Sequence, residues 1–470
     1  MFLYEMDRTE SVPLYEQLTR HIQNDILEGR LSAGTHLPSK RQAARDLGVS
    51  VMTVQGAYGQ LLAEGYIVAE ERRGYFVAQV ERVKQATPMT AVSKPLKRGA
   101  EDDSVLDVTK NRVAAGLFPF ATWSKLSRRV LSEQGVGLLD PVPFNGVLSL
   151  REAIADVLYR RCGMAVSPEQ IVIGSGNESL YGLLLTLLGR DNVYAVETPG
   201  YPLIDRLYRR MGVAVRHLPL DGQGISTDAL EASDATVLHI SPAHHFPTGT
   251  VTSVTRRQEL LKWAAGKPER YIIEDDYDSE FRLSGRPIPP LQRMDRDGCV
   301  VYMNTFSKTV APSLRIAYAV LPQGLLERYR EMLGFLSCPV AAFEQHTLAA
   351  FIREGYFDRH INRLRTHYRA LRDGLVESLD FGALAGRCHP VRDDAGLHFL
   401  VRVDVPRSVR DEELTRAALE QGLRIHTLRD YDHRPSASDS HTFILNYSGL
   451  SPEDIPQFAQ RMERTLRQYE

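Results

Sequence analysis

The sequence predicts a small helical domain that ends in strands, over residues 10–78, and a larger α/β domain with a mostly parallel sheet, over residues 106–470. Three observations support this prediction. Two short helix patterns meet at a tight turn near residue 48, and apolar strand-like runs alternate with helical stretches after residue 170. Between the two domains, residues 79–105 carry few large apolar side chains. A chain of 470 residues is also too long for a single hydrophobic core.

The composition is that of an ordinary globular protein, with 43% apolar and 25% charged residues. The formal net charge of −2 excludes a globally basic nucleic-acid binder but allows a local basic patch. We find no apolar run near the roughly 20 residues of a membrane span, and no signal-peptide pattern in the first residues. The four cysteines form no C-x-x-C pair, so we expect no metal site and a reducing, cytoplasmic setting.

The elements of the first domain follow from local signals. Its first helix is predicted from an apolar stripe of helical period, formed by Leu14, Leu18, Ile22 and Ile26. Ser39 is the expected N-cap of a second helix, and Gly48 lies just past its end. Ser50 is the expected N-cap of a third helix, which Gly65 ends. Two short strands around a polar turn are predicted for residues 66–78.

Two helices joined by a short turn match the helix-turn-helix plan, in which the second helix enters the major groove of DNA. Basic side chains on the first helix are candidates for phosphate contacts, and a hairpin tip would form the wing. The residues that we expect to contact DNA are Lys40, Arg41, Arg45, Ser50, Thr53, Gln55, Arg72 and Arg73. Residues 1–78 carry eight basic and ten acidic side chains, so the positive charge must gather on one face. A helix-turn-helix used only for protein contacts would have a similar pattern.

Residues 79–105 combine several charges with two prolines and few large apolar side chains, which predicts a flexible linker. After it, buried strands are predicted at seven apolar runs: "QIVIG", "NVYAVE", "AVRHLPL", "TVLHIS", "YIIEDD", "CVVYMNT" and "IAYAVL". Such alternation with helical stretches is typical of a sheet that is largely parallel and covered on both faces.

A lysine in a segment of small hydroxyl residues suggests a cofactor site. Lys308 lies close to Thr305 and Ser307, and Arg315 follows seven positions later. A desolvated lysine amine can form a Schiff base with an aldehyde cofactor. Pyridoxal phosphate also requires a carboxylate, a phosphate-binding loop and a ring to stack on. Arginine makes paired contacts to phosphate oxygens, which gives a reason for its place so near the lysine.

Each of the other requirements has a candidate. Asp275 ends an apolar run and is a candidate to hold a proton on the pyridine nitrogen, with Tyr277 beside the ring hydroxyl. The glycine turn that ends at Gly176 precedes a predicted helix, whose exposed amides favour an anion. Tyr201, after a Pro-Gly turn, is the candidate for ring stacking. Alternatives stay open for each: a metal site or a solvated turn for the acids, tight packing for the glycines, and a core position for the tyrosine.

Taken together and in this order, the segments resemble known families. "LPSKRQAARDLGVSVMTVQGAYGQLLAEGYI" resembles the winged-helix domain of GntR-type bacterial regulators. Residues from about 107 to 470 resemble the fold-type-I pyridoxal phosphate enzymes, the aspartate aminotransferase group. "IIEDDYDSEFRLSG" and "NTFSKTVAPSLRIAYAV" resemble the versions found in MocR-type regulators, the GntR subgroup that joins both parts.

The resemblance implies that Lys308 is the Schiff-base lysine, that Asp275 is the partner of the pyridine nitrogen, and that Tyr277 is the partner of the ring hydroxyl. It implies a phosphate cradle formed by Gly176, the amides of Asn177 and Glu178, Thr305, Ser307 and Arg315. It also implies a head-to-tail homodimer that binds operator DNA. Its signal would be pyridoxal phosphate itself or an amine or amino acid.

The sequence departs from these families at several positions. Val51 stands where many GntR relatives have an arginine, and the wing has "RRGYFV" in place of "GSGTFV". Phe246 replaces an asparagine of the aminotransferase "HNPTG" turn, and Ile444 stands about where aminotransferases bind the substrate carboxylate with an arginine. The candidates for a replacement of that arginine are Arg424, Arg402 and His426.

The sequence therefore predicts a cytoplasmic bacterial transcriptional regulator that binds an operator and senses pyridoxal phosphate, an amine or an amino acid. Two alternatives from other classes remain: a working aminotransferase with an accessory DNA-binding domain, and a binding protein that has lost the cofactor.

Overall fold

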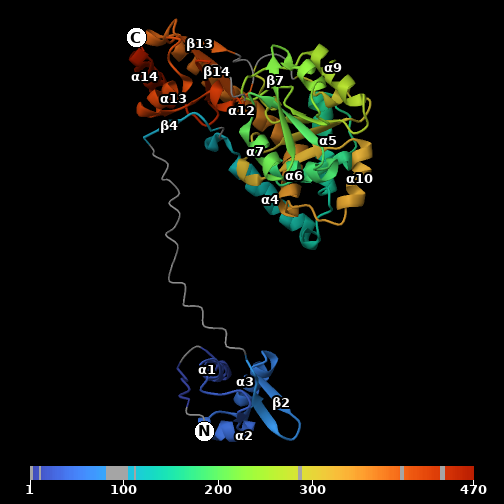
Figure 1. Ribbon diagram of the computed structural model, residues 1–470, viewed down its shortest axis with the longest axis vertical. Helices are drawn as coiled ribbons and strands as arrows, with labels where there is room; N and C mark the ends of the chain where they lie inside the picture. Colours follow the sequence, from blue (N-terminus) through green and yellow to red (C-terminus); the bar gives the residue numbers. More distant parts are fainter. Residues whose placement is uncertain are drawn as a thin grey trace. The chain divides into compact units, whose positions relative to one another are not determined.

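The computed structural model describes residues 4–9, 12–80, 104–110, 113–283, 288–391, 396–433 and 440–469 (Figure 1). These residues form two compact units, which divide the chain between Glu101 and Asp102. Most of the expected linker, residues 81–103, lies outside the described residues, so the linker stays a prediction.

The first unit has three helices and a small antiparallel sheet in the order β1-β3-β2. Its elements are α1 (Leu14–Leu27), β1 (His36–Leu37), α2 (Lys40–Leu47), α3 (Val51–Ala63), β2 (Ile67–Glu70) and β3 (Gly74–Val77). Strands β2 and β3 form a hairpin, as a winged helix requires. The core includes Leu18, Ile22, Val54, Tyr58 and Leu61. This unit confirms the predicted winged helix-turn-helix.

The turn between α2 and α3 is built by the predicted caps. Ser39 Oγ accepts a hydrogen bond from the backbone amide of Gln42 at 3.2 Å at the start of α2. Gly48 ends the helix with φ of +60°, in the left-handed region that favours glycine. Ser50 Oγ then accepts from the amide of Thr53 at 3.0 Å and starts α3.

The second unit is built around an eight-stranded sheet in the order β5-β12-β11-β10-β9-β6-β7-β8. The strands are β5 (Ile171–Gly174), β6 (Val193–Thr198), β7 (Ala214–Asp221), β8 (Gly224–Ile225), β9 (Val237–Ile240), β10 (Tyr271–Asp276), β11 (Val300–Thr305) and β12 (Ala317–Val320). Strands β11, β10, β9, β6 and β7 run parallel, which confirms the predicted α/β fold. Strand β12 is antiparallel to both neighbours, β11 and β5.

Helices cover both faces of this sheet (Figure 1). One apolar core joins the sheet to α4 (Phe120–Gln134), α5 (Leu148–Cys162), α11 (Ala342–Arg353) and α12 (Tyr356–Leu379). Two further cores involve α6 (Asn177–Leu188), α7 (Pro202–Arg210), α8 (Thr227–Glu231), α9 (Val254–Ala265) and α10 (Gln323–Leu333). The sheet is thus buried on both faces, which explains why its strands are apolar throughout rather than alternating.

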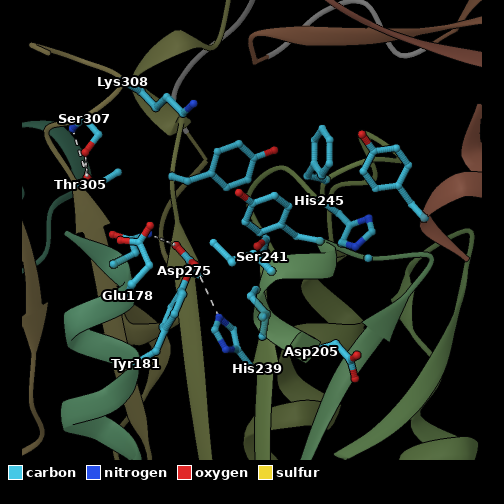
Figure 2. A pocket seen from close by; sticks show the side chains of 18 of the residues that line it. Glu178, Tyr181, Asp205, His239, Ser241, His245, Asp275, Thr305, Ser307 and Lys308 are labelled. Atoms are coloured by element: carbon cyan, nitrogen blue, oxygen red, sulfur yellow. Dashed lines mark hydrogen bonds and ion pairs between the residues drawn. The ribbon is translucent and has the colours of Figure 1, made fainter. Parts of the chain in front are cut away.

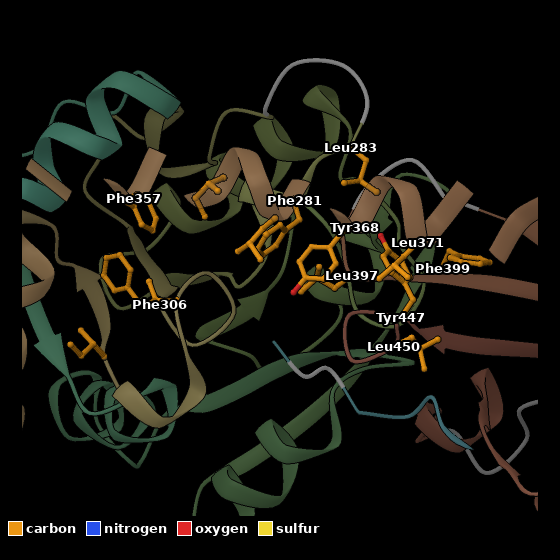
Figure 3. Packing of buried hydrophobic residues seen from close by; sticks show 14 of the residues in the cluster. Phe281, Leu283, Phe306, Phe357, Tyr368, Leu371, Leu397, Phe399, Tyr447 and Leu450 are labelled. Atoms are coloured by element: carbon orange, nitrogen blue, oxygen red, sulfur yellow. The ribbon is translucent and has the colours of Figure 1, made fainter. Parts of the chain in front are cut away.

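A smaller four-stranded sheet, in the order β13-β14-β17-β16, forms the C-terminal part. Its strands and helices are β13 (Cys388–Val391), β14 (His398–Val403), α13 (Asp411–Glu420), β16 (His426–Thr427), β17 (Thr442–Asn446) and α14 (Asp454–Leu466). Strand β15 (Leu423–Arg424) pairs in parallel with β4 (Leu106–Asp107). The long helix α12 packs against segments next to both sheets. Its Tyr368 ring lies 5.3 Å from that of Phe281, which follows β10, and 6.4 Å from that of Tyr447, which follows β17, between centroids (Figure 3).

Candidate functional site

A pocket of about 770 Å³ lies at the carboxyl ends of the parallel strands. Its wall includes Glu197 from β6. Figure 2 shows three further wall residues at the strand ends: His239 from β9, Asp275 from β10 and Thr305 from β11. Ligands of open parallel sheets bind at this edge, because the loops that follow the strands converge there. The pocket also contains Lys308, Tyr277, Tyr201, Asn177, Glu178, Ser307 and Arg315.

Lys308 follows β11 and extends into the pocket (Figure 2). Burial lowers the pKa of its amine from the usual 10.5, and Asp278 opposes this effect in part. A lowered pKa increases the share of uncharged amine at neutral pH, and the uncharged amine is the nucleophilic form.

Asp275 is held by side chains that the sequence analysis did not connect with it. Tyr181 Oη donates a hydrogen bond to Asp275 Oδ2, and Asn177 Nδ2 donates to Oδ1 at 3.3 Å. His239 Nε2 lies 3.5 Å from Oδ2, and the other nitrogen of this imidazole contacts Tyr208 Oη at 2.7 Å. These contacts fix the carboxylate at the floor of the pocket, where it can pair with a protonated ring nitrogen.

The glycine loop between β5 and α6 lies directly against the Arg315 side chain at the pocket. Gly176 has φ of +92° and ψ of 169°, and a Cβ there would lie 2.4 Å from Arg315 Nη2. The guanidinium donates to the carbonyl of Ser175 at 3.2 Å and pairs with Glu178. Thr305 Oγ1 donates to Ser307 Oγ at 2.9 Å across the same corner.

This corner fits a phosphate group. The Arg315 and Glu178 side chains are about half exposed, so the carboxylate of Glu178 can yield its place to an entering anion. The start of α6 at Asn177 presents backbone amides to the same corner. A lysine, a buried carboxylate and a phosphate corner in one pocket are what pyridoxal phosphate requires.

Aromatic rings form the wall beside this corner. Tyr201 caps α7, is 48% exposed and meets Phe246 edge-on at 5.9 Å. Phe246 also packs edge-on against Tyr431 at 5.2 Å. Tyr277 Oη lies 3.4 Å from His244 Nδ1. The exposed ring of Tyr201 leaves a surface on which a flat ligand can stack.

Glu197 is a buried acid that the sequence analysis missed. It accepts a hydrogen bond from the amide of Ser241 at 3.0 Å, and His245 Nε2 lies 3.5 Å from the same oxygen. Burial raises the pKa of Glu197 to about 8 and lowers the pKa of His245 to about 3, so both groups are mainly neutral at pH 7. The sequence signal that could have identified Glu197 is its position near the end of the apolar run "NVYAVET".

The three candidates for a carboxylate-binding group do not line the pocket. Arg424 pairs with Asp107 at 3.3 Å, and Arg402 lies at a separate hollow along β14. His426 contacts the lining residue Tyr431 through Nδ1 at 3.0 Å, but does not itself line the pocket. These three interpretations are therefore corrected, because the strands that carry the residues turn them to other surfaces.

In the first unit, the residues expected to contact DNA differ in solvent exposure and in their side-chain contacts. Arg41, Arg45, Gln55, Arg72, Arg73 and Ser50 are exposed, and Lys40 and Thr53 are partly buried. Lys40 lies over the ring of Tyr75 at 5.4 Å, and Arg73 pairs with Glu70. Ser50 and Thr53 are tied to one another by the helix cap.

Two exposed side chains beside the turn were given no contact role by the sequence analysis. Arg8 Nη2 donates to the carbonyl of Gly48 at 2.9 Å, and Met52 at the start of α3 is 74% exposed. The latter follows the exposed Val51, so the start of the recognition helix presents apolar groups as well as Gln55.

A winged helix with an exposed recognition helix, in one chain with an aminotransferase-type pocket, defines a DNA-binding regulator that carries a ligand domain. Family comparisons agree: residues 14–77 match the gntR family of bacterial regulatory proteins, and residues 104–462 match aminotransferase class I and II. The chain belongs to the MocR-type group of GntR transcriptional regulators, in which these two domains are fused. Pyridoxal phosphate is the cofactor of the aminotransferase family, and the pocket residues fit it.

The similarity extends over whole chains. The HTH-type transcriptional regulator YdeL of Bacillus subtilis, itself uncharacterized, is 35% identical over 97% of this chain and 98% of its own. The probable rhizopine catabolism regulatory protein MocR of Rhizobium meliloti is 32% identical over 96% and 93%. The pyridoxine biosynthesis regulator PdxR of Corynebacterium glutamicum is 30% identical over 90% and 89%.

Among solved structures, a kynurenine aminotransferase of Pyrococcus horikoshii has a TM-score of 0.68 at 22% identity, covering 78% of this chain and 92% of its own. That similarity shows the fold. In the described part of the chain, no helix combines the length and the apolar character of a membrane span.

Proposed function

We propose that the second unit binds pyridoxal phosphate through Lys308 and senses the cofactor, or an amine or amino acid, to control operator binding by the first unit. The observation that carries this proposal is the meeting of Lys308, Asp275 and Arg315 in one pocket of a chain that begins with a winged helix. The coupling requires only that the ligand bind one arrangement of the protein better than another.

The protein groups have separate tasks in this proposal. Lys308 supplies the amine, Asp275 keeps a proton on the ring nitrogen, and Tyr181 and Asn177 keep Asp275 in place. Arg315 neutralises phosphate charge. When bound, pyridoxal phosphate supplies an aldehyde that reacts with primary amines and a ring that withdraws electrons.

Sensing is favoured over amino-acid transamination by two positions. Phe246 lines the pocket where aminotransferases have an asparagine, and buried Ile444 packs behind it with Leu400 and Tyr431. Neither side chain can donate a hydrogen bond to a substrate carboxylate. The relatives named for rhizopine catabolism and pyridoxine biosynthesis are likewise regulators by name.

We propose a homodimer, with the head-to-tail arrangement that the resemblance implies. Val136 and Leu139 are 80% and 76% exposed, and Phe335 and Leu336, on a nearby segment, are 81% and 49% exposed. The amide of Cys338 donates to the carbonyl of Val142 at 3.3 Å, which joins the two segments. Large exposed apolar side chains on neighbouring segments favour an interaction surface here.

The operator contacts expected of Arg41, Arg72, Thr53 and Gln55 remain part of the proposal, as do the domain bounds 10–78 and 106–470. Action on chromosomal operators would place the protein in the cytoplasm.

The test compares two lysines of the same pocket. Purified full-length protein, titrated with pyridoxal phosphate, should develop a visible absorption band that Lys308→Ala removes. Lys110 also lines the pocket, and Lys110→Ala should retain the band. Loss of the band in both variants, or in neither, would reject Lys308 as the attachment point. Operator binding measured with and without the cofactor then tests the coupling.

A further inference from the structure

The side of the pocket that faces the small sheet has a different chemistry from the phosphate corner. Tyr201, Phe246 and Tyr431 line it, and Phe246 meets the other two rings nearly at right angles, at 89° and 83°. Behind these rings, Ile444 and Leu400 are buried in the same apolar cluster. This wall therefore suits an apolar or aromatic body.

The cationic groups described around the pocket already have assigned partners or roles. Lys110 Nζ lies 3.3 Å from Asp107 Oδ2, and Arg315 is held by Glu178 and the carbonyl of Ser175. Lys308 is assigned to the cofactor. Among the described lining residues, then, no further lysine or arginine stands at the aromatic wall to pair with a carboxylate.

Asn446 gives the second observation, because it offers an acceptor and not a donor. It is 2% exposed and lines the pocket, and its Nδ2 donates to the carbonyls of Val108 and Thr109 at 3.2 and 3.3 Å. Two carbonyl neighbours fix the orientation of the amide, since an oxygen placed there would face oxygens. The carbonyl oxygen Oδ1 is buried and has no hydrogen-bond donor. A buried acceptor without a donor is costly, and a ligand N–H or O–H would satisfy it.

The pocket also contains Asp205, on the far side of the view from Lys308 (Figure 2). Its Oδ1 is contacted by Arg209 at 2.7 Å and His217 at 3.0 Å. Asp205 thus adds a carboxylate to this part of the wall, which disfavours a second one. A ligand carboxylate brought there would lose its water without gaining a lysine or arginine partner.

We propose that the effector of this pocket is a primary amine with an apolar or aromatic body and without a carboxylate on the amine-bearing carbon. This inference rests on the proposed function, since the amine would bind at the cofactor site. It adds the class of the ligand. The proposed amine differs from the corresponding amino acid only in lacking the carboxylate.

The test uses matched pairs of probes on full-length protein loaded with pyridoxal phosphate. Tyramine is compared with L-tyrosine, and 2-phenylethylamine with L-phenylalanine, since each pair differs only by the carboxylate. The readouts are the absorption spectrum of the bound cofactor and the thermal unfolding temperature. We expect each amine to half-saturate at a concentration about tenfold or more below its amino acid, because an unpaired buried carboxylate is strongly disfavoured.

Two variants should lower the preference for the amine. Ile444→Arg places a guanidinium beside Phe246 and Tyr431 and should lower the tyramine preference about tenfold. Since Ile444 is fully buried and an arginine there puts folding at risk, Phe246→Asn is the second variant. It adds an amide donor at a partly exposed position and should shift the preference in the same direction.

The outcomes separate this inference from the proposed function. Equal or tighter binding of the amino acids by the wild-type protein overturns the amine assignment, as does a lack of response to every probe while the cofactor stays bound. In both cases the cofactor proposal survives. If no cofactor band forms at all, the cofactor proposal fails and this inference fails with it.

Discussion

Replacing Gly176 by alanine tests the phosphate corner most directly. The φ of +92° and ψ of 169° belong to a region that is almost restricted to glycine, and other residues there cost about 1–3 kcal/mol. The new methyl group would lie 2.4 Å from Nη2 and 2.6 Å from Cζ of Arg315, so the guanidinium must move. One hydrogen bond from a charged group contributes about 1.5–3 kcal/mol, so Gly176→Ala should raise the Kd for pyridoxal phosphate about 10- to 100-fold.

The assay is an equilibrium titration of the cofactor-free protein, followed by the visible absorption of the bound cofactor, with thermal unfolding recorded in parallel. Gly182→Ala is the matched control, because Gly182 lies inside the same helix α6 and a Cβ there makes only an ordinary contact at 3.4 Å with Met211. An alanine inside a helix is favoured by up to about 1 kcal/mol over glycine, so the control should keep its affinity and its stability. A Kd for Gly176→Ala within about threefold of wild type, or an equal loss in Gly182→Ala, would refute the reasoning.

Further predictions concern charge and assembly. The rate of cofactor attachment should rise with pH and level off below pH 10.5, because burial lowers the pKa of Lys308; a plateau only above this value contradicts the burial argument. The raised pKa of Glu197, about 8 against the usual 4.5, means that the folded state holds a proton that the unfolded state releases, so stability falls as pH rises from about 5 through 8. Glu197→Gln should therefore flatten the fall of the unfolding temperature between about pH 5 and 9, and an unchanged slope would show that the acid is already charged. Arg41→Ala should reduce the slope of log K against log salt for operator binding by about 0.9, while Arg20→Ala on α1 should leave it unchanged. Phe335→Glu should shift the sedimentation of the protein towards the monomer, whereas Phe381→Glu, at an equally exposed site, should not.

Much of the fold follows from local signals. Ser39, Gly48 and Ser50 determine the ends of two helices through hydrogen bonds and backbone angles that involve near neighbours, so the sequence suffices to predict them. The buried strands are apolar throughout and short, which is visible in the sequence as well. The direction of β12 is not, because an apolar run has the same pattern in a parallel and an antiparallel strand.

The site was predictable where it follows strand ends and glycine turns, as for Asp275 and Gly176. The side chains that hold Asp275 were not, because Tyr181 on α6 and His239 on β9 meet it only when helix and strands pack. Similarly, the acceptor role of Asn446 depends on carbonyls more than 300 positions earlier in the chain. Arg402 and Arg424 show the opposite case. Both are arginines in the C-terminal part of the sequence, where a carboxylate-binding group was expected, but Arg402 lines a separate hollow and Arg424 pairs with Asp107.

The short strand β4 places the start of the second unit at its own binding site. Leu106 and Asp107 pair with β15, the carbonyls of Val108 and Thr109 receive Asn446, and Lys110 borders the cavity. Residues 106–110, near the start of the second unit, therefore lie at the wall of the pocket, close to any ligand bound there. A ligand that changes the contacts of Asn446 would thus act directly on the first segment of the second unit, without a relay through its apolar core.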